Sequence, residues 1–303
     1  MATAQQIIAL MRDYSIETTP GTAVKVESFK ALLPPGTCVN VTFLPGTDYN
    51  DTVATARRLK DEGMVPVPHI AARSIPSREA LETYLGRLHD EAGVTQALVV
   101  GGGVRKPLGL FDAAIELLET GLFEQHGIRK IGIAGHPEGT PDITPEAVKS
   151  HTLGKARWAA DRGLSMYLVT QFCFEAEPVM AWMKWLTDNG VTLPVRIGVP
   201  GPASIKTLLR FAQECGIGPS MRVITRQAAN IAKLLTVQTP DELLAGLAEF
   251  KARDTAGQLD GIHLYPFGGF AKTCTWFNTV KAGHFALDRA GTGFSLVETA
   301  KAS

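Results

Sequence analysis

Runs of consecutive apolar residues alternate with amphipathic segments along almost the whole chain. Consecutive apolar positions are typical of strands covered on both faces, as in a parallel sheet flanked by helices. These runs predict strands at 14–19, 38–43, 65–71, 96–102, 130–135, 165–172, 193–199 and 261–267. The amphipathic segments between them predict helices at 52–62, 77–92, 110–120, 144–162, 177–189 and 204–215.

Capping residues support several of these helix boundaries. Ser77 precedes one helix, and Thr144 precedes Pro145 at the start of another. A hydroxyl just before a helix and a proline in its first turn are both favoured there. Glycines such as Gly93 follow the helices, where a left-handed residue commonly ends the helix.

Eight strands alternating with helices favour a (β/α)8 TIM barrel, with a doubly wound open sheet as the main alternative. The stretch 217–258, between predicted strands seven and eight, is longer than one crossover needs. It predicts extra helices at 222–236 and 240–253, the second with Thr239 as its cap. Because no repeat, low-complexity tract or linker interrupts the chain, we expect one catalytic domain over residues 1–303, without a regulatory domain.

The composition narrows the class of protein. The 303 residues include 30 Lys and Arg against 30 Asp and Glu, and this balance argues against a nucleic-acid or acidic-membrane partner. No apolar run approaches the ~20 residues of a membrane span, and the N-terminal residues lack the pattern of a secretion signal. The four cysteines are far apart, which favours reduced thiols in a cytoplasmic protein over disulfides or a zinc site.

Polar residues follow the predicted strands at the end where TIM barrels place their chemistry. They include Glu17, Thr42, His69, His136, Gln171 and Tyr265, and the glycine run Gly101, Gly102 and Gly103 lies at the same end of the fourth strand. Burying an unpaired polar group costs free energy, so each of these residues needs a partner or a ligand. Structural alternatives are a salt bridge for Glu17, a backbone-bonded core position for His69, and a simple turn for the glycines.

Other catalytic patterns are absent from the sequence. The glycine run lacks the spacing G-x-G-x-x-G, which argues against a Rossmann dinucleotide site. The chain has no H-E-x-x-H, G-x-S-x-G or phosphate-binding P-loop motif. We therefore predict no metal site.

Five motifs, in order at successive strand ends, resemble those of one family. They are SIETTP (15–20), VPHIAAR (67–73), AGHPEGTP (134–141), VTQFCFEAE (169–177) and GVPGPAS (198–204). Over residues 12–285 the chain resembles the methylenetetrahydrofolate reductases, whose catalytic domain is a flavin-carrying (β/α)8 barrel. The resemblance implies a cytoplasmic oxidoreductase of one-carbon metabolism that interconverts 5,10-methylene- and 5-methyltetrahydrofolate.

The resemblance also implies roles for particular residues. Glu17 matches the catalytic acid that protonates the folate when its five-membered ring opens, since a buried carboxyl can keep a proton near neutrality. Gln171 matches the glutamine that binds the pterin, where an amide both donates and accepts. Phe174 and Tyr265 join it as substrate-binding candidates. Thr42 and His69 match positions near the flavin.

Departures from the family pattern lie mostly on the flavin side. The family's R-G-D after the fourth strand is replaced by Val100-Gly101-Gly102, and the tyrosine of its Y-P-E is His136. In the helix after the fifth strand, Lys155 is the cofactor-binding candidate. FAD is therefore implied by the family, although most residues that contact it are replaced.

This pattern leads to the hypothesis that hydride passes directly between NAD(P)H and the folate. A nicotinamide would then lie near Gly101–Gly103, where glycines allow close approach of a ring or phosphate. A folate-dependent methyl-transfer barrel and a non-catalytic folate-binding protein are the alternatives. The sequence does not distinguish NADH from NADPH, the direction of the reaction, or a monomer from a homo-oligomer.

Overall fold

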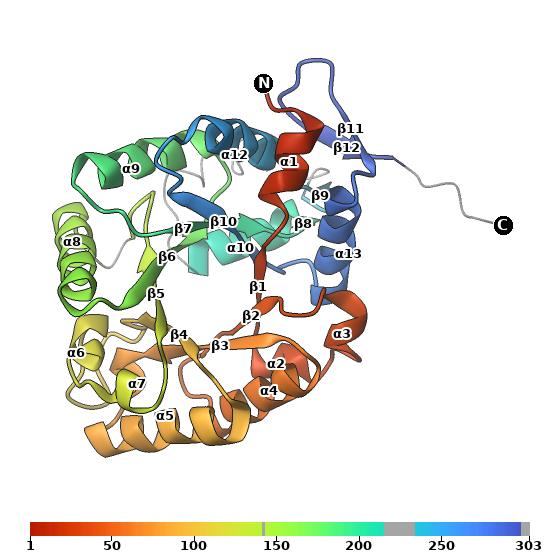
Figure 1. Ribbon diagram of the computed structural model, residues 1–303. Helices are drawn as coiled ribbons and strands as arrows, with labels where there is room; N and C mark the ends of the chain where they lie inside the picture. The colour runs from red at the N-terminus through yellow and green to blue at the C-terminus, as the bar shows by residue number, and fades with distance from the viewer. Residues whose placement is uncertain (141–142, 215–233, 298–303) are drawn as a thin grey trace. The chain divides into compact units, whose positions relative to one another are not determined.

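All eight predicted strands are present in the computed structural model, which describes residues 1–140, 143–214 and 234–297 (Figure 1). They are β1 (Ser15–Thr18), β2 (Cys38–Val41), β3 (Val65–Ala71), β4 (Gln96–Val100), β5 (Lys130–Gly135), β6 (Ser165–Phe172), β7 (Val195–Pro200) and β10 (Leu259–Tyr265). The strands close into a parallel barrel in the order β1-β10-β7-β6-β5-β4-β3-β2. The predicted (β/α)8 TIM-barrel fold is thus confirmed.

Helices connect successive strands of the barrel. The larger ones are α4 (Tyr49–Asp61), α5 (Arg78–Ala92), α8 (Pro145–Arg162), α9 (Ala176–Asp188), α10 (Ile205–Glu214), α12 (Asp241–Arg253) and α13 (Phe270–Lys281). Shorter ones are α1 (Ala4–Leu10), α2 (Pro20–Ala23), α3 (Phe29–Leu32), η1 (Ala72–Ser74), α6 (Ala114–Leu118) and α7 (Leu122–Gln125). Two small antiparallel pairs complete the described elements: β8 (Ala203–Ser204) with β9 (Val237–Gln238), and β11 (Phe285–Leu287) with β12 (Phe294–Leu296).

Most of the predicted helix boundaries are confirmed. The Ser77 hydroxyl accepts a hydrogen bond from the N–H of Ala80 at 3.2 Å, and Gly93 ends the same helix in the left-handed conformation. The Thr144 hydroxyl likewise accepts from Ala147. The predicted Thr239 cap is wrong, because its hydroxyl instead donates to the carboxylate of Asp241.

The two predicted helices between strands seven and eight have different outcomes. Helix α12 confirms the helix predicted at 240–253. The helix predicted at 222–236 lies almost wholly in 215–233, outside the described residues.

The described residues group into two units of dense contact. The first comprises Ser15–Ala134 and Gly154–Val169 and is called the β1–β5 unit here. The second comprises Met1–Tyr14, Gly135–Leu153 and Thr170–Ser303 and is called the β7–β10 unit. Helices α4 and α5 pack side by side within the β1–β5 unit, and α1 packs on α12 within the β7–β10 unit (Figure 1).

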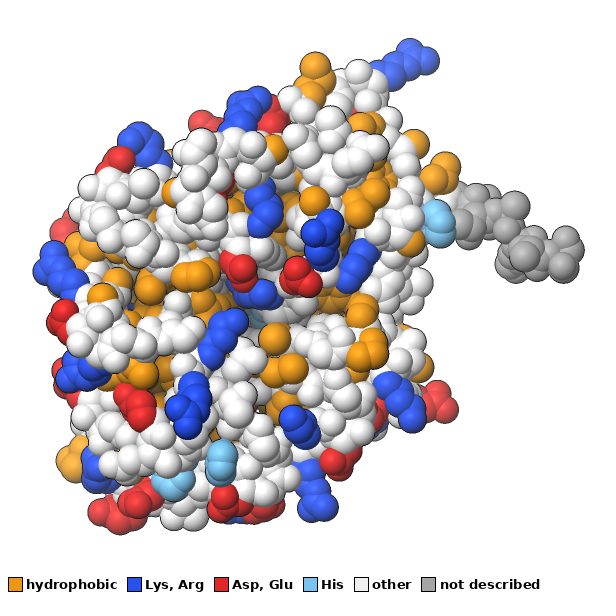
Figure 2. Space-filling view, in the orientation of Figure 1, with side chains coloured by type: hydrophobic (Ala, Val, Ile, Leu, Met, Phe, Trp, Pro, Cys, Tyr) orange, Lys and Arg blue, Asp and Glu red, His pale blue; other side chains and the backbone are white. Residues whose placement is uncertain are grey.

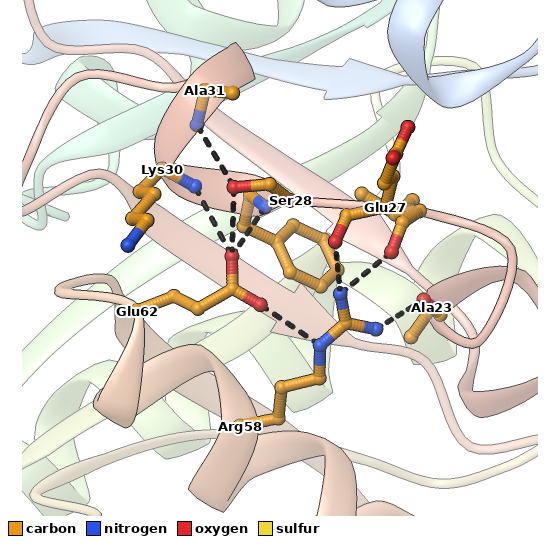
Figure 3. A network of polar contacts seen from close by, with 9 residues as sticks. Ala23, Glu27, Ser28, Lys30, Ala31, Arg58 and Glu62 are labelled. Carbon is orange, nitrogen blue, oxygen red and sulfur yellow. Dashed lines mark hydrogen bonds and ion pairs between the residues drawn. The ribbon is translucent and has the colours of Figure 1, made fainter.

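A hydrogen-bond network fastens the segment after β1 onto helix α4 (Figure 3). The Arg58 guanidinium donates to the carbonyls of Ala23 and Val26 at 2.8 and 2.6 Å and to Glu62 at 2.8 Å. The Glu62 carboxylate also accepts from the N–H of Phe29 at the start of α3. Burial opposes ionisation of Glu62, but these hydrogen bonds prevail and hold its pKa below the usual range. The network therefore orders the chain directly after the strand that carries Glu17.

Surface charge is mixed in sign. Figure 2 shows Lys and Arg side chains interspersed with Asp and Glu over the face that it displays. Among the described residues, no helix has the length and apolar character needed to cross a membrane.

Candidate functional site

Strands β1, β2 and β3 present a row of polar side chains, called here the polar strand face: Glu17, Asn40, Thr42 and His69. The register pairs Glu17 with Asn40, and Asn40 with Val67, two residues before His69. Because residues two apart on a strand share a face, these side chains lie on the side of the sheet that Val67 occupies. Val67 belongs to a buried cluster with Leu98 and Tyr167, so the polar side chains adjoin the core.

Asn40 is the member of this face that the sequence-based prediction missed. Its side chain is only 2% exposed, and its Nδ2 lies 3.4 Å from Nε2 of His69. The signal was available, since an asparagine in the apolar run CVNVTF needs a hydrogen-bond partner when buried. The contact shows that His69 is bonded to a side chain.

Thr42 lies just beyond the end of β2. Its backbone N–H donates to the carbonyl of Thr18 at 2.8 Å, which extends the pairing of the two strands. Its hydroxyl is buried and has no hydrogen-bond partner among the described residues. An unsatisfied buried hydroxyl costs about 1–3 kcal/mol, so a ligand that hydrogen-bonds to this atom would recover that cost.

A pocket adjoins His69 within the β1–β5 unit. It is lined mainly by aromatic and aliphatic side chains, including Phe43, Tyr49, His69, Ile75, Pro76 and Tyr84. The rings of Tyr49 and Tyr84 are 5.1 Å apart and tilted. The pocket therefore places the His69 imidazole among mainly aromatic and aliphatic side chains, with Ser74 as a further polar lining residue.

Arg73 anchors the glycine-rich loop that follows β4. Its backbone N–H donates to the carbonyl of Gly101, and its Nε donates to the Asp112 carboxylate at 2.9 Å. Gly102 has a φ of +93°, and a Cβ there would lie 3.2 Å from the Cβ of Ala71. At Gly101 and Gly103 an added Cβ would meet no atom within 4 Å. The loop is thus fixed by the hydrogen bonds of Arg73 and has open space above two of its glycines. The helix predicted at 110–120 begins only at Ala114.

Helix α8 carries two hydrogen-bond donors for which the described residues supply no acceptor. Burial lowers the pKa of Lys155 to about 8, and its ammonium forms no ion pair with a described carboxylate. Three residues on, the indole N–H of Trp158 is buried and has no hydrogen-bond partner among the described residues. Residues three apart on a helix are neighbours, so the two donors share one side of α8.

The β7–β10 unit has an aromatic cluster at its strand ends. Phe172, at the end of β6, is 1% exposed and contacts the rings of Phe174, Tyr265 and Phe267 at centroid distances of 5.6, 5.4 and 4.7 Å. The ring of Phe267 stacks on Phe211 at 4.0 Å. Phe174, Tyr265, Phe267 and Phe211 are each only partly buried, so the cluster has an accessible edge.

The strand that carries Gln171 is held tightly by its neighbours. The Thr170 hydroxyl donates to the carbonyl of Gln171 at 2.7 Å and accepts from the N–H of Gly198 at 2.8 Å. The Tyr265 hydroxyl donates to the carbonyl of Thr170 at 2.9 Å. A Cβ at Gly198 would lie 2.4 Å from the carbonyl oxygen of Gln171, so only glycine fits there. Tyr265 thus supports the backbone around Gln171, a role that its strand-end position did not reveal.

His263 is a further polar residue that the sequence-based prediction missed. It pairs with Gly198 in the register of β10 and β7 and is 1% exposed. Its ring meets Tyr265 edge to face, with centroids 5.0 Å apart. Because His263 lies within the mostly apolar run GIHLYPF, the sequence already indicated a buried polar residue near the end of a strand.

His136 lies in a tight turn after β5. The N–H of Gly139, which has a φ of +77°, donates to the carbonyl of His136 at 3.2 Å. Burial, together with the charge of Glu138, raises the pKa of the Cys173 thiol. A raised thiol pKa disfavours the reactive thiolate form. Among the described residues, no group of three or more His, Cys, Asp or Glu side chains is placed to hold a metal ion.

Comparisons with known proteins support the fold. No family model matches the chain. An uncharacterized protein from Clostridium thermocellum that binds two copies of 5-methyl-5,6,7,8-tetrahydrofolic acid is similar, with a TM-score of 0.54 and 15% identity over 92% of this chain and 96% of that one. At this identity the likeness concerns the fold.

Two further solved structures have lower scores. A conserved protein of unknown function from Enterococcus faecalis has a TM-score of 0.46 and 16% identity, over 89% of this chain and 65% of that chain. A family 18 chitinase from Crocus vernus has a TM-score of 0.47 and 12% identity, over 83% of this chain and 92% of that chain.

Proposed function

We propose that this protein binds a reduced folate and interconverts 5,10-methylene- and 5-methyltetrahydrofolate with NAD(P)(H). The observation that carries the proposal is the polar strand face, where a carboxyl, an amide–imidazole pair and an unsatisfied hydroxyl line up on three adjacent strands. The C. thermocellum protein of similar fold binds 5-methyltetrahydrofolate, which supports a folate as the ligand here.

Gln171, Phe174 and Tyr265 are the proposed folate-binding residues. A pterin is a flat ring with a hydrogen-bonding edge, which suits an amide beside partly buried aromatic rings. The strand end at Gln171 is fixed by the bonds from Thr170 and Tyr265, so the amide starts from a defined backbone position. This preorganisation reduces the entropy lost on binding.

Glu17 is the proposed acid. In the reducing direction the carboxyl donates a proton to N10 as the C–N10 bond of the five-membered ring breaks, leaving the one-carbon unit as an iminium on N5. A hydride then adds to that carbon and gives the 5-methyl group. The reverse direction returns the proton to Glu17. A positioned acid of this kind contributes about 10²–10⁴-fold to the rate.

Thr42, His69, Gly101, Gly102, Gly103, His136 and Lys155 are the proposed cofactor-side residues. The open space above Gly101 and Gly103 suits close approach of a ring or phosphate, and no described residue hydrogen-bonds to the Thr42 hydroxyl. The donors Lys155 and Trp158 suit an anionic group. Arg73 is already bonded to Asp112, so it does not replace the arginine of the family's R-G-D. These features favour a nicotinamide nucleotide, which would supply or accept the hydride, over FAD.

The test begins with the visible absorption spectrum of the purified protein, before and after addition of FAD. We expect a colourless protein that reduces NAD(P)+ in the presence of 5-methyltetrahydrofolate. Tightly bound FAD with flavin-dependent turnover would refute direct hydride transfer. Folate binding without nicotinamide-dependent turnover would refute the oxidoreductase and leave the methyl-transfer or binding alternatives.

Calorimetric titration with 5-methyltetrahydrofolate tests the folate side separately. We expect Gln171→Ala to weaken binding at least about tenfold, because the amide hydrogen bonds are lost. The matched control is Gln5→Ala on the exposed side of α1, which should bind like the parent protein. The stoichiometry from the same titration shows whether one or two folates bind.

A further inference from the structure

We propose that Arg73 is a positioning residue for the nicotinamide nucleotide. It fixes the loop of residues 101–113, so that Gly101–Gly103 are held in place before the nucleotide binds. The role of Arg73 in the loop stands on hydrogen bonds within the β1–β5 unit, and its consequence for the nucleotide rests on the proposed function. Arg73 acts through the loop and not as a ligand, because its guanidinium is engaged with Val104 and Asp112.

The loop has no secondary structure of its own to hold its shape. Strand β4 ends at Val100 and α6 begins at Ala114, and the described residues between them form neither a helix nor a strand. Ordering such a segment costs conformational entropy. A loop that ordered only on binding would pass this cost on to the affinity for its ligand. Contacts with neighbouring segments are therefore what can fix the loop beforehand.

Arg73 supplies contacts along the whole loop. Its backbone N–H donates to the carbonyl of Gly101 at 2.9 Å, and its own carbonyl accepts from the N–H of Leu108 at 2.8 Å. Its Nε donates to the carbonyl and the carboxylate of Asp112 at 3.0 and 2.9 Å. Its Nη1 donates to the carbonyl of Val104 at 3.5 Å, the longest of these contacts. One residue thus ties the start, the middle and the end of the loop to the segment after β3.

The backbone and the side chain of Arg73 hold different parts of the loop. The backbone bonds to Gly101 and Leu108 survive a substitution, whereas the bonds to Val104 and Asp112 need the guanidinium. A planar guanidinium serves several acceptors in a fixed geometry, which an ammonium does not match. The side chains of Arg73 and Asp112 are 27% and 61% exposed, so their ion pair adds little to global stability. Replacing Arg73 should therefore loosen the loop without unfolding the protein.

The glycine run lies between two of these anchored points. The carbonyls of Gly101 and Val104, on either side of the run, are both bonded to Arg73. Between them, Gly102 packs against Ala71 so closely that an added Cβ would lie 3.2 Å from the Ala71 Cβ. Gly101 and Gly103 themselves have no atom within 4 Å of an added Cβ. The run therefore combines space for a ring or phosphate with a fixed backbone.

Hydrogen–deuterium exchange followed by mass spectrometry tests the role of Arg73 in the loop without any ligand. In Arg73→Met we expect peptides covering residues 104–112 to exchange at least about tenfold faster than in the parent protein, because the guanidinium contacts are lost. Arg73→Lys should lie between the two. Arg57→Met, which removes an exposed arginine from an ion pair on α4, is the control and should leave exchange in this loop unchanged. Unchanged exchange in Arg73→Met would overturn the proposal.

Titration of the same proteins with NADH and NADPH, followed by nicotinamide fluorescence, tests the consequence for the nucleotide. We expect Arg73→Met to weaken binding about five- to tenfold, because the loop must then order on binding. Arg73→Lys should restore part of the affinity, and 5-methyltetrahydrofolate affinity should change less than about twofold. A loosened loop with unchanged nucleotide affinity would overturn the proposal. Equal losses of nucleotide and folate affinity would also overturn it, since they indicate a merely structural arginine.

A double variant distinguishes positioning from direct contact with the nucleotide. If Arg73 acts through the loop, Arg73→Met should weaken binding much less in an Asp112→Ala background than in the parent protein, because the two changes break the same contact. An equal loss in both backgrounds would make Arg73 a direct ligand and overturn its positioning role.

Turnover separates this proposal from the proposed function. A parent protein that binds the nucleotide without transferring hydride refutes the proposed reaction, whereas the affinity comparison still decides the role of Arg73. A parent protein that binds neither NADH nor NADPH overturns both.

Discussion

The two units differ in how some of their buried polar groups find hydrogen-bond partners. In the β1–β5 unit, the Thr42 hydroxyl and the Trp158 indole N–H are buried and have no partner in the part of the chain that the structure describes. In the β7–β10 unit, the hydroxyls of Thr170 and Tyr265 are bonded to backbone at 2.7 and 2.9 Å. Thr273 is an exception there, since its buried hydroxyl lies against the backbone of Gly201 without a hydrogen bond.

This difference indicates a division of work. Hydrogen bonds from a ligand would offset the desolvation cost of the unpaired buried groups in the β1–β5 unit. In the proposed function this unit therefore supplies polar recognition and proton transfer. The aromatic cluster of the β7–β10 unit offers ring faces on a fixed backbone, which suits a flat ligand. Substitutions in each unit test this division, beginning with the one of largest expected effect.

Glu17→Gln should reduce turnover at least about 100-fold while changing folate affinity less than about threefold. The amide keeps the shape of the side chain but cannot donate the acid proton to N10. Steady-state kinetics and calorimetry on the same preparation measure both quantities. Glu82→Gln on the exposed side of α5 is the control. Activity that survives in Glu17→Gln would place the chemistry elsewhere.

Gly198→Ala should destabilise the protein by about 1–3 kcal/mol or more, because its Cβ would overlap the Gln171 carbonyl. Gly101→Ala, where an added Cβ meets nothing within 4 Å, should stay within about 0.5 kcal/mol of the parent. Urea unfolding of both variants makes the comparison. Equal midpoints would show that the strand end at Gln171 is not rigid.

Lys155→Met should stabilise the protein near neutral pH by on the order of 1–3 kcal/mol, because it removes a charge that burial disfavours. The folded-state pKa of about 8 lies below the ordinary 10.5, so the penalty is complete below pH 8. It declines between pH 8 and 10.5, where the unfolded state binds more protons. Thermal unfolding between pH 8 and 10.5 should show the melting temperatures of Lys155→Met and the parent protein converging as the pH rises. A difference in melting temperature that stays constant with pH would contradict a lowered pKa of Lys155. Lys184→Met, an exposed lysine on α9, is the control.

Tyr265→Phe should cost about 1 kcal/mol of stability, the usual net value of one hydrogen bond, since the Thr170 carbonyl loses its donor. Folate affinity should fall less than about threefold, because phenylalanine keeps the ring that would face the folate and loses only the hydroxyl that supports the backbone. Denaturant unfolding and the folate titration measure the two effects. A large loss of affinity with little loss of stability would instead make the hydroxyl a direct ligand contact.

The pattern of apolar runs predicted the barrel because parallel strands that are covered on both faces consist mostly of consecutive apolar residues. Helix α13 was missed, although Phe270, Thr273, Cys274 and Phe277 follow helical spacing. Its threonines, cysteine and aromatic residues have low helix propensity, so tertiary packing makes this segment helical. Helix α6 begins later than predicted. The Arg73 guanidinium donates to the backbone carbonyl of Asp112 and so holds the residues before Ala114 in a loop.

The sequence by itself determined which strand ends carry Glu17, His69 and Gln171, because each strand is recognisable locally. Only the tertiary structure decided how neighbouring strands align. That alignment places Asn40 beside His69 and Gly198 against Gln171. It also turns the Tyr265 hydroxyl toward a backbone carbonyl. These pairings join residues on different strands, and register across a sheet depends on packing that no single segment encodes.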